Sequence, residues 1–560
     1  MLNKNLLPSE IYNELKEFIE PAQLLVNNYD VETIGPNAII GTPLRSQSEF
    51  LGTIHHALNI HRYQESKFRE KLILTADESQ LLEFFKETNL ISKDKKTLSS
   101  IEIMDFSKKA SRIPWKDDVA TRVFVKNFGY DESLVPIKED IKTVSEIILT
   151  PKKDHETGKI ILVLNDDKPL KELYLYQSKV FFKADELVEN KYMKFMLSMP
   201  TGSGKTRTAM EIVTHYFNRD DNRQVLWLAG QKELNEQAIE SFKHIWPHLG
   251  KNDKKIYRLW DRYESQHIEN NSFIIAGVRK LSNLLKKNPE LIKPKLIIID
   301  EAHHAIAPEW KKLIEKLVLN SKACVIGLTA TPIRGNSNEN EKLKQFFQNK
   351  IIEIESDGKE TNPITYLQKK GFLARVIEKP KIESKAEFNI PREVLRDLSR
   401  REDLPDEFLS ILAKNHERNY SIVKKLIELS GKKTLYFGTN RFQTKLMCTI
   451  LIAKKIKAAY VDGDSPTAYR NNVIKKFKEG DIDIICNCEL FTTGFDEPKI
   501  EAIVIGRPTQ SKVIHQQMVG RGMRGPKMDG TLNFELYEMD DKLEKLGVEG
   551  IQNFIVNEWE

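Results

Sequence analysis

The sequence predicts an α/β protein with two doubly wound parallel-sheet lobes in tandem, preceded by an additional N-terminal α+β domain. From about residue 169 onward, short runs of Ile, Val and Leu alternate with amphipathic helical stretches. Strands that are apolar along their whole length and alternate with helices are typical of a parallel sheet covered on both faces. A charged stretch with Gly and Pro interrupts this alternation near residue 355. The alternation then resumes, so we expect two sheets.

Each part of the chain has its own expected elements. Residues 1–168 contain no recognisable catalytic or ligand-binding motif, and we expect an accessory domain there that binds nucleic acid or a partner protein. Within it, residues 145–164 read as two strands around a Gly-containing turn. The strands expected in the lobes lie at 224–230, 272–278, 295–300, 323–330, 433–439, 458–463, 482–487 and 501–506. The lobe boundaries are expected at 169–355 and 356–545, with a tail at 546–560.

Composition narrows the class of protein without naming a function. Apolar residues make up 40% of the chain and charged residues 30%, which suits several buried cores. No stretch approaches the roughly 18 apolar residues of a membrane span, and the first residues lack a signal-peptide pattern, so we expect a cytoplasmic protein with no membrane partner. Four cysteines exclude a disulfide framework and a zinc site of the usual spacing. The net charge of +6 permits nucleic-acid binding but does not establish it.

A glycine-rich segment between an apolar strand and a helix predicts a phosphate-binding loop. Its glycines would let backbone N–H groups approach phosphates, and the helix N-terminus adds positive partial charge. Lys205 is expected to reach the β- and γ-phosphates of a nucleotide, and the Thr206 hydroxyl to bind Mg²⁺. Met199 stands where the strict pattern has Gly, and a simple turn before a helix is the alternative. The expected nucleotide-binding residues are Thr201, Gly202, Ser203, Gly204, Lys205 and Thr206.

A second apolar strand ends in adjacent carboxylates, in the stretch IIIDEAHHA. Ligands gather at the carboxyl ends of parallel strands, so Asp300 is expected beside the phosphate loop if the two strands are neighbours, where it would hold Mg²⁺. Glu301 would orient or deprotonate the attacking water. A protein-only metal site is the rival interpretation, but His303 and His304 are adjacent and would not converge from a helix. His304 is interpreted as a surface residue.

With GSGKT and DEAH in this order, the chain resembles the helicases and translocases of superfamily 2 over about residues 175–530. The resemblance implies two RecA-like lobes, ATP and Mg²⁺ as cofactors, and Gln177 as the adenine reader. It also implies that several residues lie along a nucleic-acid strand. In the first lobe these are Gly230, Gln231, Gly277 and Lys280, and in the second they are Asn440 and Thr493.

The second lobe resembles the family in its other motifs as well. By resemblance Gly494 approaches the nucleotide closely and Asp496 faces its ribose. The stretch QMVGRGMR matches QxxGRxxR with Gln517, Arg521 and Arg524. Independently of that match, two arginines three residues apart share one face of a helix, from which guanidinium groups can stabilise a phosphoryl-transfer transition state. An ordinary basic helix face is the alternative. The family also implies a contact between His303 and Gln517.

The combination of DEAH, LTATP and TTGFDEP looks most like the restriction-enzyme and DNA-repair branch of the superfamily. We therefore expect an ATP hydrolase that acts as a DNA helicase or translocase, with duplex DNA favoured over RNA. Repair, restriction or phage defence would suit it, with a separate nuclease or other subunit as partner. An ATP-gated clamp that recruits a nuclease without unwinding, and an RNA helicase, are the alternatives.

Overall fold

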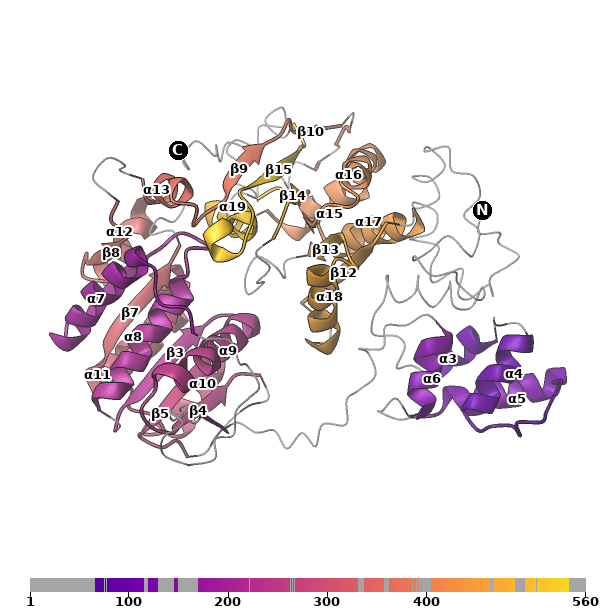
Figure 1. The fold of residues 1–560 in the computed structure, drawn as a ribbon, viewed down its shortest axis with the longest axis horizontal. Coiled ribbons are helices and arrows are strands. Elements are labelled where there is room, and N and C mark those ends of the chain that lie inside the picture. The colour runs from indigo at the N-terminus through magenta and orange to yellow at the C-terminus, as the bar shows by residue number, and fades with distance from the viewer. Residues whose placement is uncertain are drawn as a thin grey trace.

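A computed structural model describes residues 66–74, 76, 78–114, 119–128, 146–149, 170–220, 222–261, 263, 265, 267–330, 337–356, 362–384, 386–388, 390–391, 394, 404–454, 456–463, 465, 467–488, 499–509 and 511–542. Two sheets covered by helices dominate this part of the chain (Figure 1). The expected pair of parallel-sheet lobes is confirmed.

The sheet of the first lobe runs in the order β1-β4-β5-β3-β6-β7-β2-β8. All neighbours are parallel except β1, which pairs antiparallel with β4. Its strands are β1 (Glu146–Leu149), β2 (Lys194–Ser198), β3 (Gln224–Ala229), β4 (Lys254–Leu259), β5 (Ser272–Gly277), β6 (Leu296–Asp300), β7 (Cys324–Thr329) and β8 (Ile351–Glu353).

Both faces of this sheet are buried, which explains why its strands are apolar throughout. Along β3, Val225 and Trp227 join one hydrophobic cluster, whereas Leu226 and Leu228 join another on the opposite face. The first cluster includes α8 and α9, and the second includes α10 and α11. The helices are α7 (Leu175–Glu189), α8 (Lys205–Arg219), α9 (Lys232–Leu249), α10 (Val278–Lys287), α11 (Pro308–Ser321) and α12 (Ser337–Phe346).

The second lobe has a seven-stranded parallel sheet in the order β10-β15-β14-β11-β13-β12, with β9 also paired to β15. Its strands are β9 (Arg375–Glu378), β10 (Ile382–Glu383), β11 (Thr434–Phe437), β12 (Ala458–Asp462), β13 (Ile484–Cys488), β14 (Ala502–Ile505) and β15 (Asn533–Asp540). Its α-helices are α13 (Pro363–Lys369), α15 (Asp406–Lys414), α16 (His416–Glu428), α17 (Arg441–Ala453), α18 (Thr467–Glu479) and α19 (Lys512–Val519).

A buried ion pair joins the carboxyl ends of several strands in this lobe. Arg418 on α16 is fully buried and binds Asp541, with 2.5 Å from Nε to Oδ1 and 2.9 Å from the guanidinium Nη2 to Oδ2. The guanidinium also donates to the Thr439 hydroxyl and to the Gly506 carbonyl. These partners follow β11, β14 and β15, so one side chain fixes three strand ends.

The N-terminal segment differs from the expectation in one respect. Its described helices are α3 (Ser66–Ile73), α4 (Glu78–Glu87), α5 (Ser100–Ser111) and α6 (Val119–Asn127). They pack through aromatic rings, as between Phe84 and Phe128, whose centroids lie 5.1 Å apart. The expected strand at 146–149 exists, but it joins the sheet of the first lobe through β4 and so crosses the boundary expected at residue 168.

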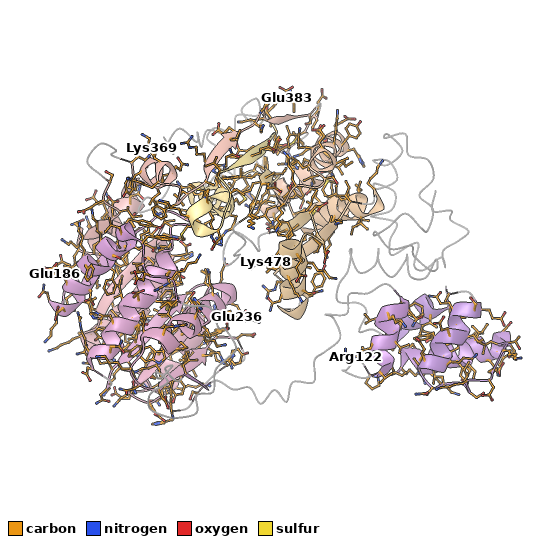
Figure 2. All side chains as sticks on the ribbon, in the orientation of Figure 1. Arg122, Glu186, Glu236, Lys369, Glu383 and Lys478 are labelled. Carbon is orange, nitrogen blue, oxygen red and sulfur yellow. The ribbon has the colours of Figure 1, made fainter. Side chains whose placement is uncertain are left out.

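Charged side chains cover the outside of these elements. Glu186, Lys369 and Lys478 are exposed on three different helices (Figure 2). Within the described residues, no helix is both long and apolar enough to cross a membrane.

Candidate active site

The phosphate loop connects β2 to α8 as expected. Gly202 and Gly204 adopt positive φ values of 80° and 83°, which side chains other than Gly rarely tolerate. Gly204 is the N-cap of α8, so Lys205 and Thr206 open the helix. Ser203 closes a tight turn, because its hydroxyl and backbone N–H both donate to the Pro200 carbonyl. The loop therefore has the backbone geometry of an anion cradle at a helix N-terminus.

Gln177 lies behind this loop rather than free in the cleft. Its side chain is 2% exposed, and its Nε2 donates to the Ser203 carbonyl at 3.0 Å. Its Oε1 accepts from the backbone N–H of Tyr174 at 2.9 Å. The Tyr176 hydroxyl donates to the same Ser203 carbonyl at 2.8 Å. A side chain on Gly204 would collide with the Gln177 amide. Gln177 and Tyr176 thus support the loop, and the role of Tyr176 was not foreseen from the sequence.

The acidic pair lies at the end of β6, but β6 and β2 are not neighbours. β7 lies between them, so the simple neighbour argument was wrong in detail. The loop and the carboxylates still share one site, because the Lys205 ammonium acts on both Asp300 and Glu301 and favours their ionised forms. The carboxyl ends of three adjacent parallel strands bring these groups together.

The two carboxylates have very different pKa values. Burial of Asp300, which is 5% exposed, raises its pKa to about 7, and the neighbouring Glu301 charge adds to that rise. Burial also opposes ionisation of Glu301, but contact with His303 and the charge of Lys205 outweigh it and lower its pKa to about 2. Glu301 is therefore ionised at neutral pH, whereas Asp300 lies near its titration midpoint.

Glu301 stands in a strained backbone conformation, with φ 55° and ψ 64°. The left-handed conformation costs free energy for a residue other than Gly, and residues held in it are found most often at functional sites. A 3₁₀ turn, η5 (Ala302–Ile306), follows it directly and carries both histidines. His303 is buried, and its Nδ1 lies 3.4 Å from Glu301 Oε2.

The interpretation of His304 as a surface residue was wrong. Its ring is partly buried and stacks on Trp310, with centroids 5.5 Å apart and planes 25° apart. The rings of His303 and His304 also lie 4.2 Å apart. The described residues contain no group of three or more His, Cys, Asp or Glu side chains arranged to hold a metal ion on their own.

The second lobe packs directly against the phosphate loop. A Cβ atom on Gly520 would lie 2.5 Å from Thr201 Cγ2, so only Gly permits this approach. A Cβ atom on Gly202 would lie 3.4 Å from the Met523 carbonyl oxygen. At the edge of this contact, the Tyr174 hydroxyl donates to the Lys527 carbonyl at 2.5 Å. The phosphate loop of the first lobe is therefore in direct contact with the second lobe.

The arginines of the second lobe reach this contact, but they do not share a helix as expected. Helix α19 ends at Val519, Arg521 lies in the 3₁₀ turn η6 (Gly520–Gly522), and Arg524 forms a bridge with Leu373. Gly520 and Gly522 disfavour continuation of the helix. Burial lowers the pKa of each arginine to about 10, and the Glu301 charge opposes that fall for Arg521. Both guanidinium groups therefore remain charged at neutral pH.

The contact expected between His303 and Gln517 stays a prediction. Both residues are described, and no hydrogen bond joins them, whereas His303 Nδ1 lies 3.4 Å from Glu301 Oε2. Gln517 is partly buried on α19. Gly494, Asp496 and Thr493 lie outside the described residues.

A groove of about 420 Å³ lies at the carboxyl ends of β3 and β5. Three of the residues expected to follow a nucleic-acid strand, Gly230, Gly277 and Lys280, line this groove together. Gln231 is the adjacent N-cap of α9, with an exposed side chain. In the other lobe, the Asn440 side chain caps α17 and accepts from the Gln443 backbone N–H at 2.9 Å.

Aromatic residues add a floor to this groove that the sequence motifs did not indicate. Trp260 is 3% exposed and Trp310 is 9% exposed, and both line it. The cations Lys232, Arg279 and Lys280 also line the groove, as do the carboxylates Asp261 and Glu309, and Lys232 Nζ lies 3.6 Å from Asp261 Oδ2. A groove lined by cations and aromatic rings suits a polyanion with flat bases.

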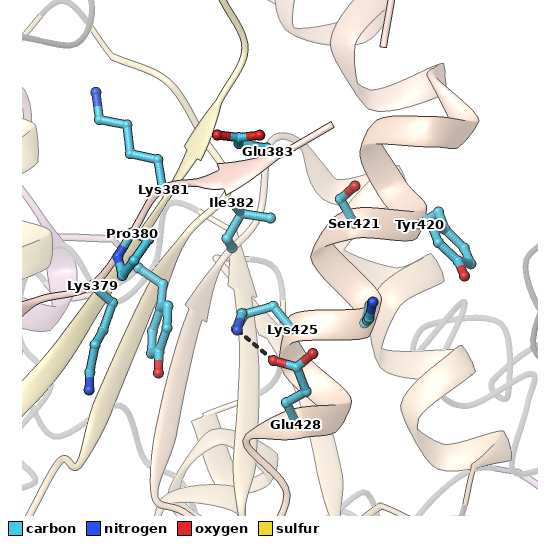
Figure 3. Close-up of a pocket in the computed structure, with 11 residues that line it drawn as sticks. Lys379, Pro380, Lys381, Ile382, Glu383, Tyr420, Ser421, Lys425 and Glu428 are labelled. Atoms are coloured by element: carbon cyan, nitrogen blue, oxygen red, sulfur yellow. Dashed lines mark hydrogen bonds and ion pairs between the residues drawn. The ribbon is translucent and has the colours of Figure 1, made fainter. Parts of the chain in front are cut away.

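A second hollow, of about 460 Å³, lies on the other lobe between β10 and α16 (Figure 3). Lys379, Lys381, Lys424 and Lys425 line it with Glu383 and Glu428. Lys379 binds Glu535 at 3.1 Å, and Lys425 lies 5.0 Å from the centre of the Tyr537 ring. Pro380 and its flanking lysines interrupt the open edge of the sheet here, which discourages pairing with another chain.

Two protein families match the chain, and each match falls on one lobe. The type III restriction enzyme res-subunit family matches residues 170–334. The helicase conserved C-terminal domain family matches residues 418–525. The two matched regions therefore include Thr201 and Gly520, the residues at which the lobes come into contact.

Individual proteins of several kinds are similar to the chain. The putative ATP-dependent helicase IRC3 of Saccharomyces cerevisiae is 29% identical over 390 residues, which are 66% of this chain and 52% of that protein. The type I restriction enzyme EcoAI endonuclease subunit of Escherichia coli is 24% identical over 67% of this chain and 46% of its own length. The chain thus spans about half the length of these relatives.

One solved structure is also similar to the chain. A fragment of a putative HsdR subunit of a type I restriction enzyme from Vibrio vulnificus covers 69% of this chain and 66% of its own, at 20% identity and a TM-score of 0.45. The first lobe thus matches the res-subunit family and the second lobe matches the helicase C-terminal domain family, and the chain is similar to a putative ATP-dependent helicase and to a restriction-enzyme subunit.

Proposed function

We propose that the protein is an ATP-driven motor that translocates along or unwinds DNA. The observation that carries this proposal is the direct contact of the second lobe with the phosphate loop of the first. Lys205 and the carboxylates come from the first lobe, and Arg521 and Arg524 come from the second. ATP bound at this junction would contact both lobes, so its hydrolysis would change the position of one lobe relative to the other.

Each side chain has a defined part in hydrolysis. The backbone N–H groups of residues 201–206 and the Lys205 ammonium would bind the phosphates. Glu301, ionised at neutral pH, would accept a hydrogen bond from the attacking water and orient it. Arg521 and Arg524 would stabilise the charge that develops on the transferred phosphoryl group. The charged arginines suit this part because burial removes competing water.

The site also suits a magnesium ion. Asp300 is a buried carboxylate, and its burial and the Glu301 charge raise its pKa more than Lys205 lowers it. A divalent cation would supply further positive charge, and hard oxygen ligands are what Mg²⁺ prefers. Asp300 and the Thr206 hydroxyl would hold the ion, which would neutralise charge on the phosphate oxygens.

Duplex DNA is the proposed track. The relatives that support it are named as restriction-enzyme endonuclease subunits, and a nuclease or other defence or repair subunit is the proposed partner. The groove with Lys280 and Arg279 would contact phosphates, so binding should be sensitive to salt and weakly dependent on sequence.

The deciding experiment measures ATP hydrolysis with single-stranded DNA, duplex DNA, forked DNA and RNA. Stimulation by duplex DNA above that by RNA supports the proposal, and stimulation by RNA alone contradicts it. Displacement of a triplex-forming strand without separation of the duplex indicates translocation, whereas strand separation indicates unwinding. Stimulated hydrolysis without either displacement indicates an ATP-gated clamp instead.

A further inference from the structure

A continuous row of side chains connects Glu301 to the groove of the first lobe. His303 lies 3.4 Å from the Glu301 carboxylate, and its ring lies 4.2 Å from that of His304. The His304 ring stacks on Trp310, which lines the groove. The two ends of the row are therefore the carboxylate proposed to orient water and the surface proposed to hold nucleic acid.

The groove end of this row lies directly beneath Gly230. A Cβ atom on Gly230 would lie 3.4 Å from Trp310 Cζ2 and 3.9 Å from His304 Cδ2. Gly230 follows the last residue of β3 and is exposed. A strand backbone that rests on Gly230 would therefore press on the two rings, with no intervening side chain at that position.

The Glu301 end of the row is also connected to Trp310 along the backbone. Glu301, in its left-handed conformation, precedes the short turn η5, and helix α11 begins at Pro308 with Trp310 in its first turn. A 3₁₀ turn has poorer hydrogen-bond geometry than an α-helix, so it yields more readily. A small displacement of Trp310 would reach Glu301 through both the rings and this turn.

We propose that His304 is a positioning residue that transmits occupancy of the groove to Glu301. This inference rests on the proposed function, because it requires a nucleic-acid strand in the groove. Contact with the strand would shift the Trp310 ring, and the stacked His304 ring would carry that shift to His303 and the Glu301 carboxylate. Its physical basis is packing between rings, so the shape of the His304 ring matters more than its charge.

The test compares His304→Ala with His304→Phe, which retains a flat ring against Trp310. Hydrolysis is measured across a range of duplex DNA concentrations, so that the maximal stimulated rate and the half-saturating DNA concentration are obtained separately. We expect His304→Ala to lower the ratio of stimulated to basal rate about tenfold, within the usual range of coupling between sites. His304→Phe should restore most of that ratio.

A matched control is His215→Ala. His215 lies on α8 in the same lobe, and its ring contacts Phe181 at 5.6 Å, away from this row. The control should keep the wild-type ratio. If the wild-type protein shows no stimulation by any nucleic acid, the proposed function fails, rather than the proposed transmission through His304, which we call the relay. If wild type is stimulated and His304→Ala keeps its ratio, the relay is wrong.

Melting temperatures show whether each variant folds. If His304→Ala fails to fold, Trp310→Phe is tested in its place, because this substitution keeps an aromatic ring but reduces the ring surface that stacks on His304. An unchanged ratio in folded Trp310→Phe would then overturn the relay. A reduced ratio at an unchanged half-saturating DNA concentration would support it, since loss of a simple binding contact would raise that concentration instead.

Discussion

Substitution of Asp300 by Asn should stabilise the nucleotide-free protein while it abolishes hydrolysis. The Asp300 carboxyl has a pKa of about 7 in the folded protein against a reference value of 3.8, because burial and Glu301 disfavour its charge. At about 1.4 kcal/mol per pKa unit, the ionised carboxylate costs the native state up to about 4 kcal/mol above pH 7. Asn occupies nearly the same volume and carries no charge, so it removes this cost.

The pH dependence has a definite sign. The folded state holds the Asp300 proton more tightly than the unfolded chain, so its stabilising effect is complete below about pH 4. That effect is lost as the pH rises toward 7, the folded pKa. The advantage of Asp300→Asn over wild type should therefore grow by about 2 kcal/mol between pH 5.5 and pH 8. For a lobe of this size each kcal/mol moves the melting temperature by about 2–4 °C.

The assay is thermal unfolding of both proteins without nucleotide or divalent cations at pH 5.5 and pH 8, with steady-state hydrolysis in parallel. Asp253→Asn is the control, because Asp253 is exposed in the same lobe. The control should change neither property. A variant less stable than wild type at pH 8, or an advantage independent of pH, would refute the assignment of an unfavourable buried charge to Asp300.

Three further outcomes follow from the geometry. Arg418→Met should lower the free energy of unfolding of the second lobe by about 3–5 kcal/mol, measured in urea, because the substitution leaves Asp541 buried without the guanidinium. Adding Asp541→Leu should recover much of that loss, and equal losses in the single and double variants would contradict this expectation. Gly520→Ala should lower hydrolysis ~10- to 100-fold by forcing the lobes apart at Thr201, and a second substitution, Thr201→Ala, should restore part of the rate. Lys280→Ala should reduce the slope of log affinity for DNA against log salt by about 1, and an unchanged slope would remove Lys280 from the phosphate contacts.

Local sequence pattern was enough to predict the two lobes and the phosphate loop. Apolar runs mark strands buried on both faces, and the glycines before Lys205 mark a turn that must adopt positive φ. These features depend on residues that are close in the sequence, so a short stretch of sequence is enough to predict them. The assignments of individual residues to nucleotide and nucleic acid stay predictions.

Features that depend on distant residues could not be read in this way. The sequence does not show that β7 separates β6 from β2, since strand order depends on how the helices cross over. Arg418 and Asp541 are 123 positions apart, and neither residue has a local pattern that indicates its partner. The stacking of His304 on Trp310 depends on the turn η5, which was not predicted from the sequence. The end of α19 was readable, because glycines at 520 and 522 disfavour a helix.

The position of β15 has a consequence for how the protein is made. β9 and β10 are the first strands of the second lobe along the chain, yet both pair with β15, which ends at Asp540. A ribosome that has completed β14 has therefore produced a lobe whose first strands still lack their partner. Such contacts between distant segments form slowly and leave a strand edge exposed in the meantime. The second lobe must finish folding after nearly all of the described chain has been synthesised, and a chain that stops before residue 533 would leave those strands open to aggregation.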